Sequence, residues 1–383
     1  MSSPLRRRAG SGWLATAAFA LATALLASVA AAQSACNGRA EFCDRTYSNV
    51  SILGTHNSYG VSPGNLAANQ NYSVTTQLDN GVRMLQVQGH MNGNELHLCH
   101  TSCFLLDAGT FTSYLAKVRS WLDANPDEVV TLLLVNSDAV AASVWAQSYT
   151  DSGLSKYVYT PSNVPIAYGA WPTYRELINA GSRVVSFLAQ GADVQTAPFL
   201  IDEFTNVWET PYDSTTNTFP CDVNRVTGSP ANKMYLMNHF LDVNTTILGE
   251  TVPTPATQEL LTTNAFSGRG SLGAQASTCL AEHGYYPTFT LVDFYDVGDG
   301  SVFKYVDSLN GVPYVQATIG DGSSSTSGSS SSSGGGAASA QSSSGSGSVS
   351  YTPLNGGGAR HGAGVGLTAA AGSLLVLFLA LLA

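Results

Sequence analysis

Residues 50–58, VSILGTHNS, form a short apolar run that ends in small and polar side chains. Val50–Gly54 has the length and composition of a buried strand, and His56 follows at its carboxyl end. Similar runs recur along the chain and predict seven further strands: Val82–Gln88, Glu95–Cys99, Val129–Val135, Arg183–Leu188, Phe199–Asp202, Met234–Asn238 and Thr288–Phe294.

Helical patterns separate these runs. In Thr110–Ala124 the residues Phe111, Leu115, Val118 and Leu122 recur at helical spacing. Further predicted helices are Ala139–Tyr149, Thr173–Ala180 and Thr257–His283, the last of them interrupted by glycine. Strands that alternate with helices predict an α/β fold, and about eight strands in one domain favour a (β/α) barrel over a Rossmann sheet. No glycine-rich phosphate loop follows a predicted strand, which argues against nucleotide binding.

The amino-terminal segment has the pattern of a secretory signal. Arg6, Arg7 and Arg8 precede a mostly apolar run over residues 13–29, and Ala30-Ala31-Ala32 follow it. A charged region, an apolar region and small residues at the cleavage site describe a signal peptide over residues 1–32. The alternative is a signal anchor that is retained.

The carboxyl-terminal segment has the pattern of a glycosyl-phosphatidylinositol (GPI) attachment signal. Asn355-Gly356-Gly357 are small, residues 358–366 form a polar spacer, and Leu367–Ala383 is an apolar tail. This order predicts attachment at Asn355 and removal of residues 356–383. A transmembrane helix is the alternative. Residues 321–350 contain 16 Ser and 7 Gly, so residues 321–355 are expected to be a flexible stalk between the anchor and a barrel domain at 33–320.

Charge and cysteine content narrow the class of protein. The chain has 16 Lys and Arg against 26 Asp and Glu, a net charge of −10, which disfavours nucleic-acid binding. Six cysteines in a secretory chain can pair completely. Proximity in the sequence suggests the pairs Cys36–Cys43, Cys99–Cys103 and Cys221–Cys279. Asn-X-Ser/Thr sites mark three candidate glycosylation positions, Asn49, Asn71 and Asn244.

Polar side chains gather at the carboxyl ends of the predicted strands, where barrels carry their chemistry. Those singled out are His56, Asn57, Gln86, Gln88, His100, Asp202, Glu203, His239 and Asp293. Histidine exchanges protons near neutral pH, which suits general acid–base catalysis. Each of these residues also has a structural interpretation, as a buried histidine or a capping carboxylate. The segment 97–103, HLCHTSC, has zinc-ligand chemistry as well, but a Cys99–Cys103 disulfide would remove two ligands.

Three blocks together carry a resemblance to a known family. The residues 51–58 (SILGTHNS), 77–83 (QLDNGVR) and 96–101 (LHLCHT) resemble the catalytic blocks of phosphatidylinositol-specific phospholipase C X-domain-like proteins and the PLC-like phosphodiesterases around them. The residues 202–204 (DEF) and 208–211 (WETP) are similar to a secreted fungal and oomycete-type branch. The resemblance covers about residues 45–320.

The resemblance implies a fold and a mechanism. The family's fold is a distorted (β/α)₈ barrel, and two histidines cleave a phosphodiester in it. By position, His56 is expected to take the proton of the attacking inositol hydroxyl and His100 to protonate the leaving alkoxide. Asp293 matches the aspartate that orients the first histidine, and Asn57 is expected to contact the substrate.

The chain departs from the family pattern at the positions of the metal ion or arginine that binds the phosphate. At the positions of Gln86 and Gln88, calcium-dependent members have carboxylate ligands, and bacterial members have an aspartate and an arginine. Val135 stands where members of the family have a further metal ligand or a lysine. Amides are weak calcium ligands, so no metal or cofactor is expected. Arg83, Gln86, Gln88 and Glu203 are included as candidate substrate-binding residues, although strand alternation places Arg83 on the opposite face from the glutamines.

The first hypothesis is therefore a GPI-anchored extracellular phosphoric diester hydrolase that acts without calcium on a phospholipid or glycosyl-phosphatidylinositol. A second hypothesis is a degenerate barrel that binds an inositol phosphate, glycan or lipid head group without turnover. A third is a hydrolase that uses Asp202 and Glu203 as its acid–base pair. The sequence leaves the oligomeric state open.

Overall fold

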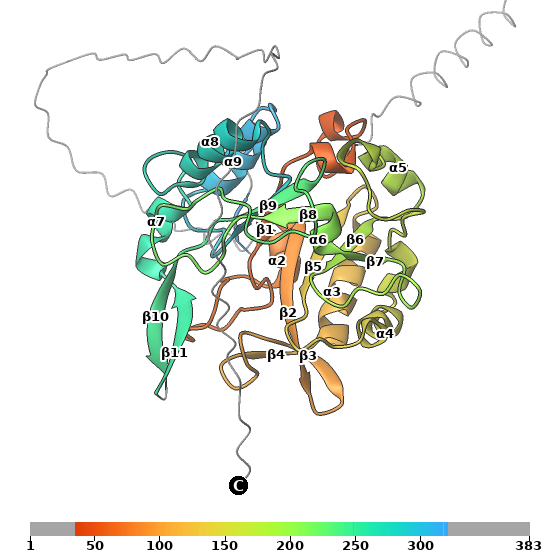
Figure 1. The fold of residues 1–383 in the computed structure, drawn as a ribbon, viewed down its shortest axis with the longest axis horizontal. Coiled ribbons are helices and arrows are strands. Elements are labelled where there is room, and N and C mark those ends of the chain that lie inside the picture. Colours follow the sequence, from red (N-terminus) through yellow and green to blue (C-terminus); the bar gives the residue numbers. More distant parts are fainter. Residues whose placement is uncertain (1–34, 248, 317, 321–383) are drawn as a thin grey trace, which may run out of the picture. The chain divides into compact units, whose positions relative to one another are not determined.

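Eight short parallel strands surround an apolar interior. The computed structural model describes residues 35–247, 249–316 and 318–320, and Figure 1 shows its ribbon. In order around the barrel the strands are β1 (Ile52–Thr55), β2 (Met84–Asn92), β5 (Val130–Val135), β6 (Val184–Leu188), β7 (Leu200–Asp202), β8 (Val207–Glu209), β9 (Met234–Asn238) and β12 (Phe289–Val292).

Each strand pairs in parallel with its neighbour, and β12 pairs with β1 to bring the last strand beside the first. Only β7 and β8 have no ladder between them in the described part of the chain. The predicted distorted (β/α)₈ barrel is confirmed.

Alternation along the strands sorts the side chains into two layers. One set faces the barrel axis and forms an apolar plug: Ile52, Met84, Leu133, Val185, Phe187, Ile201, Val207, Met234, Leu236, Phe289 and Leu291. Gly54 of β1 belongs to this inner face, where a Cβ atom would lie 2.7 Å from Leu291 Cδ2 and 3.0 Å from Met84 Cβ. A glycine therefore lets β1 pack closely against the interior.

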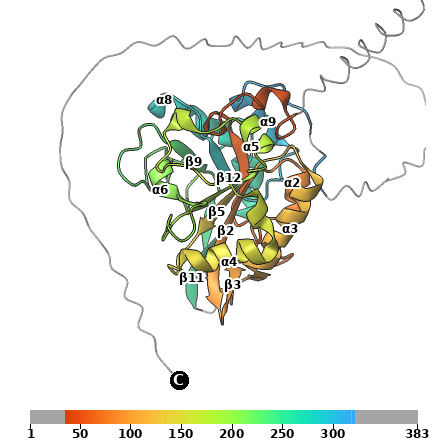
Figure 2. The ribbon, with the colours of Figure 1, turned by 90° about the vertical axis from the view of Figure 1, so that its right-hand side faces the viewer.

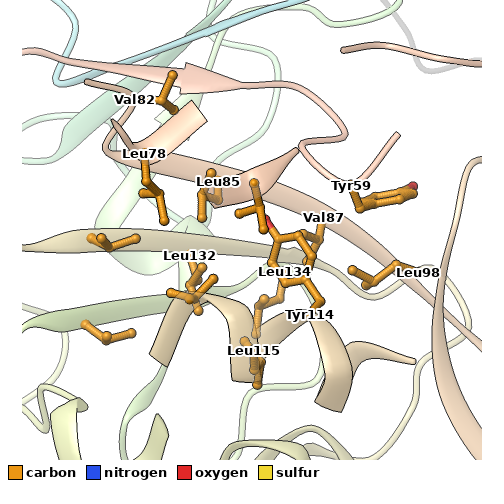
Figure 3. Packing of buried hydrophobic residues seen from close by; sticks show 14 of the residues in the cluster. Tyr59, Leu78, Val82, Leu85, Val87, Leu98, Tyr114, Leu115, Leu132 and Leu134 are labelled. Carbon is orange, nitrogen blue, oxygen red and sulfur yellow. The ribbon is translucent and has the colours of Figure 1, made fainter. Parts of the chain in front are cut away.

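The opposite set packs against the helices that cover the barrel. Figure 3 shows Leu85 of β2 and Leu132 of β5 facing Leu115 of the helix α3 (Phe111–Ala124), and all three are fully buried. Burial of each such side chain contributes about 1.5–3 kcal/mol. α3 begins at Thr110, whose hydroxyl accepts a hydrogen bond from the Ser113 N–H, and it packs beside α4 (Ala142–Ser152), as Figure 2 shows.

The remaining helices of the described residues complete the outer layer. They are α2 (Val74–Asp79), α5 (Tyr174–Asn179), α6 (Glu203–Asn206), α7 (Leu260–Thr263), α8 (Leu272–His283) and α9 (Ser301–Leu309). Short 3₁₀ helices lie at Ala40–Phe42, Tyr47–Asn49, Leu154–Tyr157, Tyr168–Ala170 and Thr257–Glu259.

Two hairpins extend from the carboxyl end of the barrel, at the lower edge of Figure 1. β2 runs on past the barrel and pairs antiparallel with β3 (Glu95–Cys99), which pairs with β4 (Asp107–Thr110). β10 (Asp242–Ile247) and β11 (Glu250–Pro255) form the second hairpin, which follows β9. The hairpins therefore flank the end of the barrel at which the candidate residues lie.

The structure corrects the predicted list of barrel strands. Glu95–Cys99 is a strand, but it belongs to the first hairpin and not to the barrel, because it pairs antiparallel with the extension of β2. The missing barrel strand is β8, a strand of three residues that follows directly after the helix α6. The predicted interruption of the helical segment Thr257–His283 is confirmed, because Gly268 and Gly270 lie between α7 and α8.

The described cysteines form three disulfide bonds. They join Cys36 to Cys43, Cys99 to Cys103 and Cys221 to Cys279, the pairs that proximity suggested. The side chains of Asn49, Asn71 and Asn244 are exposed, and their glycosylation stays a prediction. The predicted signal peptide, stalk and attachment site at Asn355 lie outside the described residues. Among the described residues, no helix has both the length and the apolarity to cross a bilayer.

Candidate active site

His56 and Asp293 are brought together by the pairing of the first and last barrel strands. Each residue directly follows its strand, β1 or β12, and His56 Nδ1 lies 2.9 Å from Asp293 Oδ1. The Asn69 amide donates a second hydrogen bond to the same carboxylate oxygen at 3.0 Å. With Nδ1–H donated to Asp293, the Nε2 atom of His56 is an acceptor, and the Asn57 amide lies 3.1 Å from it.

A second imidazole stands across from the first. His100 follows β3, and its Nδ1 donates to the Ala67 carbonyl, 2.5 Å away. This bond leaves Nε2 of His100 for a ligand. The ring centroids of His56 and His100 are 6.5 Å apart and their planes are nearly perpendicular. The Phe240 ring stacks on the His56 imidazole, with 3.9 Å between the ring centroids, and so fixes the plane of the His56 ring.

The residue after each of His56, His100 and Asp293 has its backbone in the left-handed region. The backbone φ is 41° at Asn57, 59° at Thr101 and 44° at Phe294. Asparagine adopts this region readily, whereas Thr and Phe do so at a cost of about 1–3 kcal/mol. The chain therefore turns sharply after His56, His100 and Asp293, at the carboxyl end of the barrel.

One cavity of about 190 Å³ contains both histidines. Gln86 and Gln88 of β2 lie on its wall on the inward face, as alternation requires, and Val135 of β5 lies beside them. The amide oxygens of both glutamines accept backbone hydrogen bonds. Gln86 Oε1 accepts from the Asn57 N–H at 2.5 Å, and Gln88 Oε1 accepts from the Thr101 N–H at 3.0 Å. The glutamines thus hold the two turns that follow the histidines.

The cavity also contains a cation that the sequence did not reveal. Arg225 lies in the loop between β8 and β9, and its guanidinium pairs with Glu209 at the end of β8. Backbone hydrogen bonds run between the same two residues, which form an isolated bridge. Arg225 is the one lysine or arginine on the cavity wall within the described residues. No motif flagged it, because its partner lies 16 positions earlier.

Two aspartates on the cavity wall were also missed by sequence reasoning. Burial, with a smaller contribution from the neighbouring Asp293, raises the pKa of Asp242 to about 7. Burial also raises the pKa of Asp213, against the pull of His56 and Arg225. Both carboxyls therefore hold a proton to higher pH than exposed aspartates do, which limits the negative charge of the cavity.

The two histidines have opposite pKa shifts. Burial lowers the pKa of His56, but the Asp293 carboxylate outweighs it and the net shift is upward. Burial lowers the pKa of His100, and the hydrogen bond to Ala67 offsets only part of this effect. Over an interval around the ordinary histidine pKa, the pair therefore carries one proton, and the directions of the two shifts favour its placement on His56.

Arg83 does not reach the cavity. It precedes β2 on the outward side, where its Nε donates to Glu128 at 2.8 Å and its guanidinium lies 4.9 Å above the Trp121 ring of α3. Its expected contact with substrate is wrong, because the alternation of the strand points it toward the helices.

Asp202 and Glu203 also lie off the cavity wall. The Asp202 carboxylate caps α6 by accepting from the Thr205 N–H at 2.8 Å. Glu203 is fully buried beside Glu209, behind the residues that line the cavity. The expected substrate contact of Glu203 is therefore corrected, and the pair does not form a second acid–base site.

The remaining histidines that the sequence singled out have structural partners. His239 is buried, with Gln275 Oε1 2.6 Å from Nδ1 and the Thr263 carbonyl 2.8 Å from Nε2, and burial lowers its pKa to about 4. His97 pairs with Asp107. With Cys99 and Cys103 joined in a disulfide, the zinc interpretation of residues 97–103 loses two of its ligands.

The fold and this site define an α/β barrel with two histidines and an Asp–His pair at the carboxyl ends of its strands. The family model of the PI-PLC X domain, described as PI-PLC X 1, matches residues 42–310. The chain belongs to the PI-PLC X-domain family.

Curated relatives agree with this assignment. An uncharacterized secreted protein of Arthroderma benhamiae is 45% identical over 285 residues, which cover 73% of this chain but 64% of that protein. A PI-PLC X domain-containing protein 1 of the same organism is 41% identical over 305 residues, 78% of this chain and 97% of the relative. A PI-PLC X domain-containing protein of Arabidopsis thaliana is 27% identical over 260 residues, with 63% and 55% covered.

Among solved structures, the chain is similar to a phosphatidylinositol-specific phospholipase C of Listeria monocytogenes, with a TM-score of 0.48 and 15% identity. That alignment covers 70% of this chain and 95% of the other. The F249X mutant of the Staphylococcus aureus phosphatidylinositol-specific phospholipase C has a TM-score of 0.48 and 14% identity, with 70% and 94% covered.

Proposed function

We propose that this protein is an extracellular phosphoric diester hydrolase that cleaves phosphatidylinositol or a glycosyl-phosphatidylinositol by general acid–base catalysis. The observation that carries the proposal is the pair of histidines on one cavity, 6.5 Å apart, with the first held by Asp293. The PI-PLC X-domain family and the relatives named for that domain support the substrate class.

The residues of the chain account for each proton in the proposed step. Nε2 of His56 takes the proton of the attacking inositol hydroxyl, whose oxygen forms a bond to phosphorus. The bond between phosphorus and the alkoxide of the lipid breaks, and His100 Nε2 gives that oxygen its proton. The products are a cyclic inositol phosphate and a neutral lipid alcohol. Asp293 stabilises the imidazolium that forms on His56, because its carboxylate already accepts the Nδ1–H.

The proposed reaction does not use calcium. The residues at the positions of the expected ligands fit that ion poorly. Gln86 and Gln88 offer neutral amide oxygens that already accept backbone N–H groups, and Val135 offers no ligand. Hard cations bind to charged carboxylate oxygens far better than to such amides. No cofactor enters the proposed step.

The proposed location is the outer face of the plasma membrane. The signal pattern of residues 1–32 and the attachment pattern that begins at Asn355 support a chain that is secreted and then held by a GPI lipid. The name of one relative, an uncharacterized secreted protein, supports the export of the chain.

One observation favours a second candidate, a binding protein without turnover. Strand β2 lines the cavity with two amides, where a cation that binds phosphate would be expected. Glu209, Asp213 and Asp242 add acidic groups to the cavity wall. Carboxylates and amides are good partners for the hydroxyl groups of an inositol or a glycan. A head group could therefore be held without being cleaved.

The deciding experiment follows the products of the purified protein by ³¹P NMR. Phosphatidylinositol, a glycosyl-phosphatidylinositol and a lysophospholipid are offered separately, each with and without a chelator. A cyclic phosphodiester signal from the first or second substrate in both conditions supports the hydrolase. No new phosphorus signal, together with measurable binding of inositol phosphate, would instead establish the binding protein.

A further inference from the structure

The cavity needs a positive group if it is to hold a phosphodiester. A transition state at phosphorus gathers charge on its non-bridging oxygens, and an enzyme stabilises that charge with a positioned cation or hydrogen-bond donors. On β2 this chain has Gln86 and Gln88, whose amides are turned to the backbone. Arg83 is turned toward Glu128. The cation must therefore come from another element of the barrel.

Arg225 has the chemistry and the position for this task. It lines the same cavity as His56 and His100, on the opposite side of the barrel from β2. Its Nε and Nη2 atoms donate to one oxygen of Glu209, and no contact within the described residues uses Nη1. The guanidinium therefore keeps three N–H donors for a ligand, two on Nη1 and one on Nη2, in the planar arrangement that suits phosphate oxygens.

The guanidinium is held on three sides. Its central carbon lies 4.1 Å from the centre of the Tyr212 ring and 5.4 Å from that of Phe204, and Glu209 binds its edge. The loop that carries Arg225 is tied back to β8 by the backbone bonds to Glu209. Such a clamp fixes an arginine before a ligand arrives, which reduces the entropy lost on binding.

Glu203 explains how Glu209 is held in turn. It is the first residue of α6, it is 1% exposed, and neither of its carboxyl oxygens has a conventional donor within the described residues. Burial and the neighbouring Glu209 raise the pKa of Glu203 well above its ordinary value, so it keeps its proton to higher pH than an exposed glutamate does. A protonated Glu203 is itself a donor, and Glu209 is the acceptor next to it.

We propose that Arg225 is the cation that contacts the phosphate group in this cavity, and that Glu203, acting through Glu209, is the positioning residue that holds it there. The inference rests on the proposal that the cavity takes a phosphate-bearing inositol. It assigns Arg225 a contact with the non-bridging oxygens and no part in proton transfer, which belongs to the two histidines. It also gives Glu203, which lies off the cavity wall, a role in the reaction.

The test of Arg225 compares binding with turnover. The probe is myo-inositol 1-phosphate, titrated by calorimetry into the wild type, Arg225→Gln and the control Arg175→Gln, which breaks an exposed pair with Asp44. Loss of a charged hydrogen bond should weaken affinity about 10- to 100-fold in Arg225→Gln alone. Its kcat/KM for phosphatidylinositol should fall by about 10²-fold or more.

The outcomes separate the inference from the proposed function. If the wild type binds and cleaves, and Arg225→Gln does so equally well, the role of Arg225 is wrong while the hydrolase stands. If the wild type neither binds the probe nor cleaves the lipid, both are overturned. Binding and turnover that are lost together in Arg225→Gln, but retained in Arg175→Gln, establish the contact.

The positioning role is tested by conservative rescue. Glu203→Gln still donates to Glu209, whereas Glu203→Leu does not, so the glutamine variant should bind the probe at least about tenfold more tightly. Circular dichroism checks that both variants fold. Should the leucine variant unfold, Glu209→Gln, which weakens the clamp from the other side, replaces it and should also lose about tenfold in affinity. Equal affinity across the folded variants would refute the positioning role.

Discussion

Nδ1 of His56 lies 2.9 Å from Oδ1 of Asp293, although the two residues are 237 positions apart in the sequence. The parallel pairing of β1 with β12 produces this contact, because it places Thr55 beside Val292 and the two polar residues one position further on. The contact fixes the tautomer of His56 and raises its pKa against the effect of burial.

The two histidines should each be indispensable for turnover. His56→Ala removes the proposed base and His100→Ala the proposed acid, so each variant should lose about 10²–10⁴-fold in kcat. His97→Ala is the matched control, since His97 pairs with Asp107 outside the cavity. Rates are measured on phosphatidylinositol vesicles. Wild-type rates in either of the first two variants would contradict the mechanism.

Asp293→Asn should change the pH dependence as well as the rate. Activity should be bell-shaped, because below both histidine pKa values no base remains and above both no acid remains. The productive form has His56 neutral and His100 protonated, and the two pKa shifts make it the less populated of the two singly protonated forms. Its share follows the total of singly protonated enzyme, so the higher pKa, that of His56, sets the alkaline limb and the lower pKa, that of His100, sets the acidic limb. Without the carboxylate the His56 pKa falls, so the alkaline limb should move to lower pH.

The control for that shift is Asp138→Asn, which breaks the pairing of Asp138 with His90 on the hairpin and away from the cavity wall. Its profile should match that of the wild type. The rate of Asp293→Asn should also exceed that of His56→Ala, because the imidazole remains. An alkaline limb that stays in place in Asp293→Asn would show that Asp293 does not set the His56 pKa.

Turnover should survive removal of divalent cations. Gln86 and Gln88 offer neutral amide oxygens in place of carboxylates. A chelator should therefore leave the rate within about twofold of its value in added calcium. A chelator already saturated with calcium controls for effects on the lipid surface. Loss of activity in chelator that calcium restores would mean that a metal takes part.

The Cys99–Cys103 disulfide should matter more for activity than for stability. It encloses His100 in a loop of a few residues, so its removal should cost about 2 kcal/mol of unfolding free energy. A displacement of His100 by about 1 Å would cost roughly 100-fold in rate. Cys99→Ser with Cys103→Ser is compared with Cys36→Ser and Cys43→Ser, a second short pair away from the cavity. Similar activity per folded molecule in both variants would contradict this role.

Surface attachment should depend on the small residues at the predicted lipid site. Replacement of Asn355, Gly356 and Gly357 with bulky residues should abolish display on the cell surface, because attachment requires small side chains there. Flow cytometry with an antibody to the barrel domain measures display, and treatment with a GPI-cleaving phospholipase should release the wild type. A wild-type protein that resists release would indicate a membrane helix instead.

Much of the site was predictable because it lies at the ends of strands. His56 was predicted because it follows the apolar run of β1, and alternation within β2 puts Gln86 and Gln88 on one face; both are local properties that one stretch of sequence carries. His100 and Asp293 were predicted from similar strand ends and from the resemblance of three short blocks to a family. Their chemistry is visible in the chain even though their neighbours are not.

Other assignments failed because a strand pattern does not name the partner of the strand. Glu95–Cys99 has the composition of a barrel strand, but its pairing with the extension of β2 places it in a hairpin. Strand alternation already placed Arg83 on the face opposite the glutamines, and its packing on Trp121 shows that it contacts a helix there. Glu203 directly follows a predicted strand, yet it is buried beside Glu209 because α6 begins there.

The sequence alone determined the barrel class, the disulfide pairs, and the two histidines with their aspartate, because alternation, proximity and strand ends are local properties. The tertiary structure alone decided that Arg225 lies in the cavity. The loop between β8 and β9 folds back on Glu209 through backbone hydrogen bonds and is held by the packing of the guanidinium on Tyr212 and Phe204. Such contacts between distant segments leave no periodic signal in the chain, so the positive charge of the site became visible only once the loop was folded.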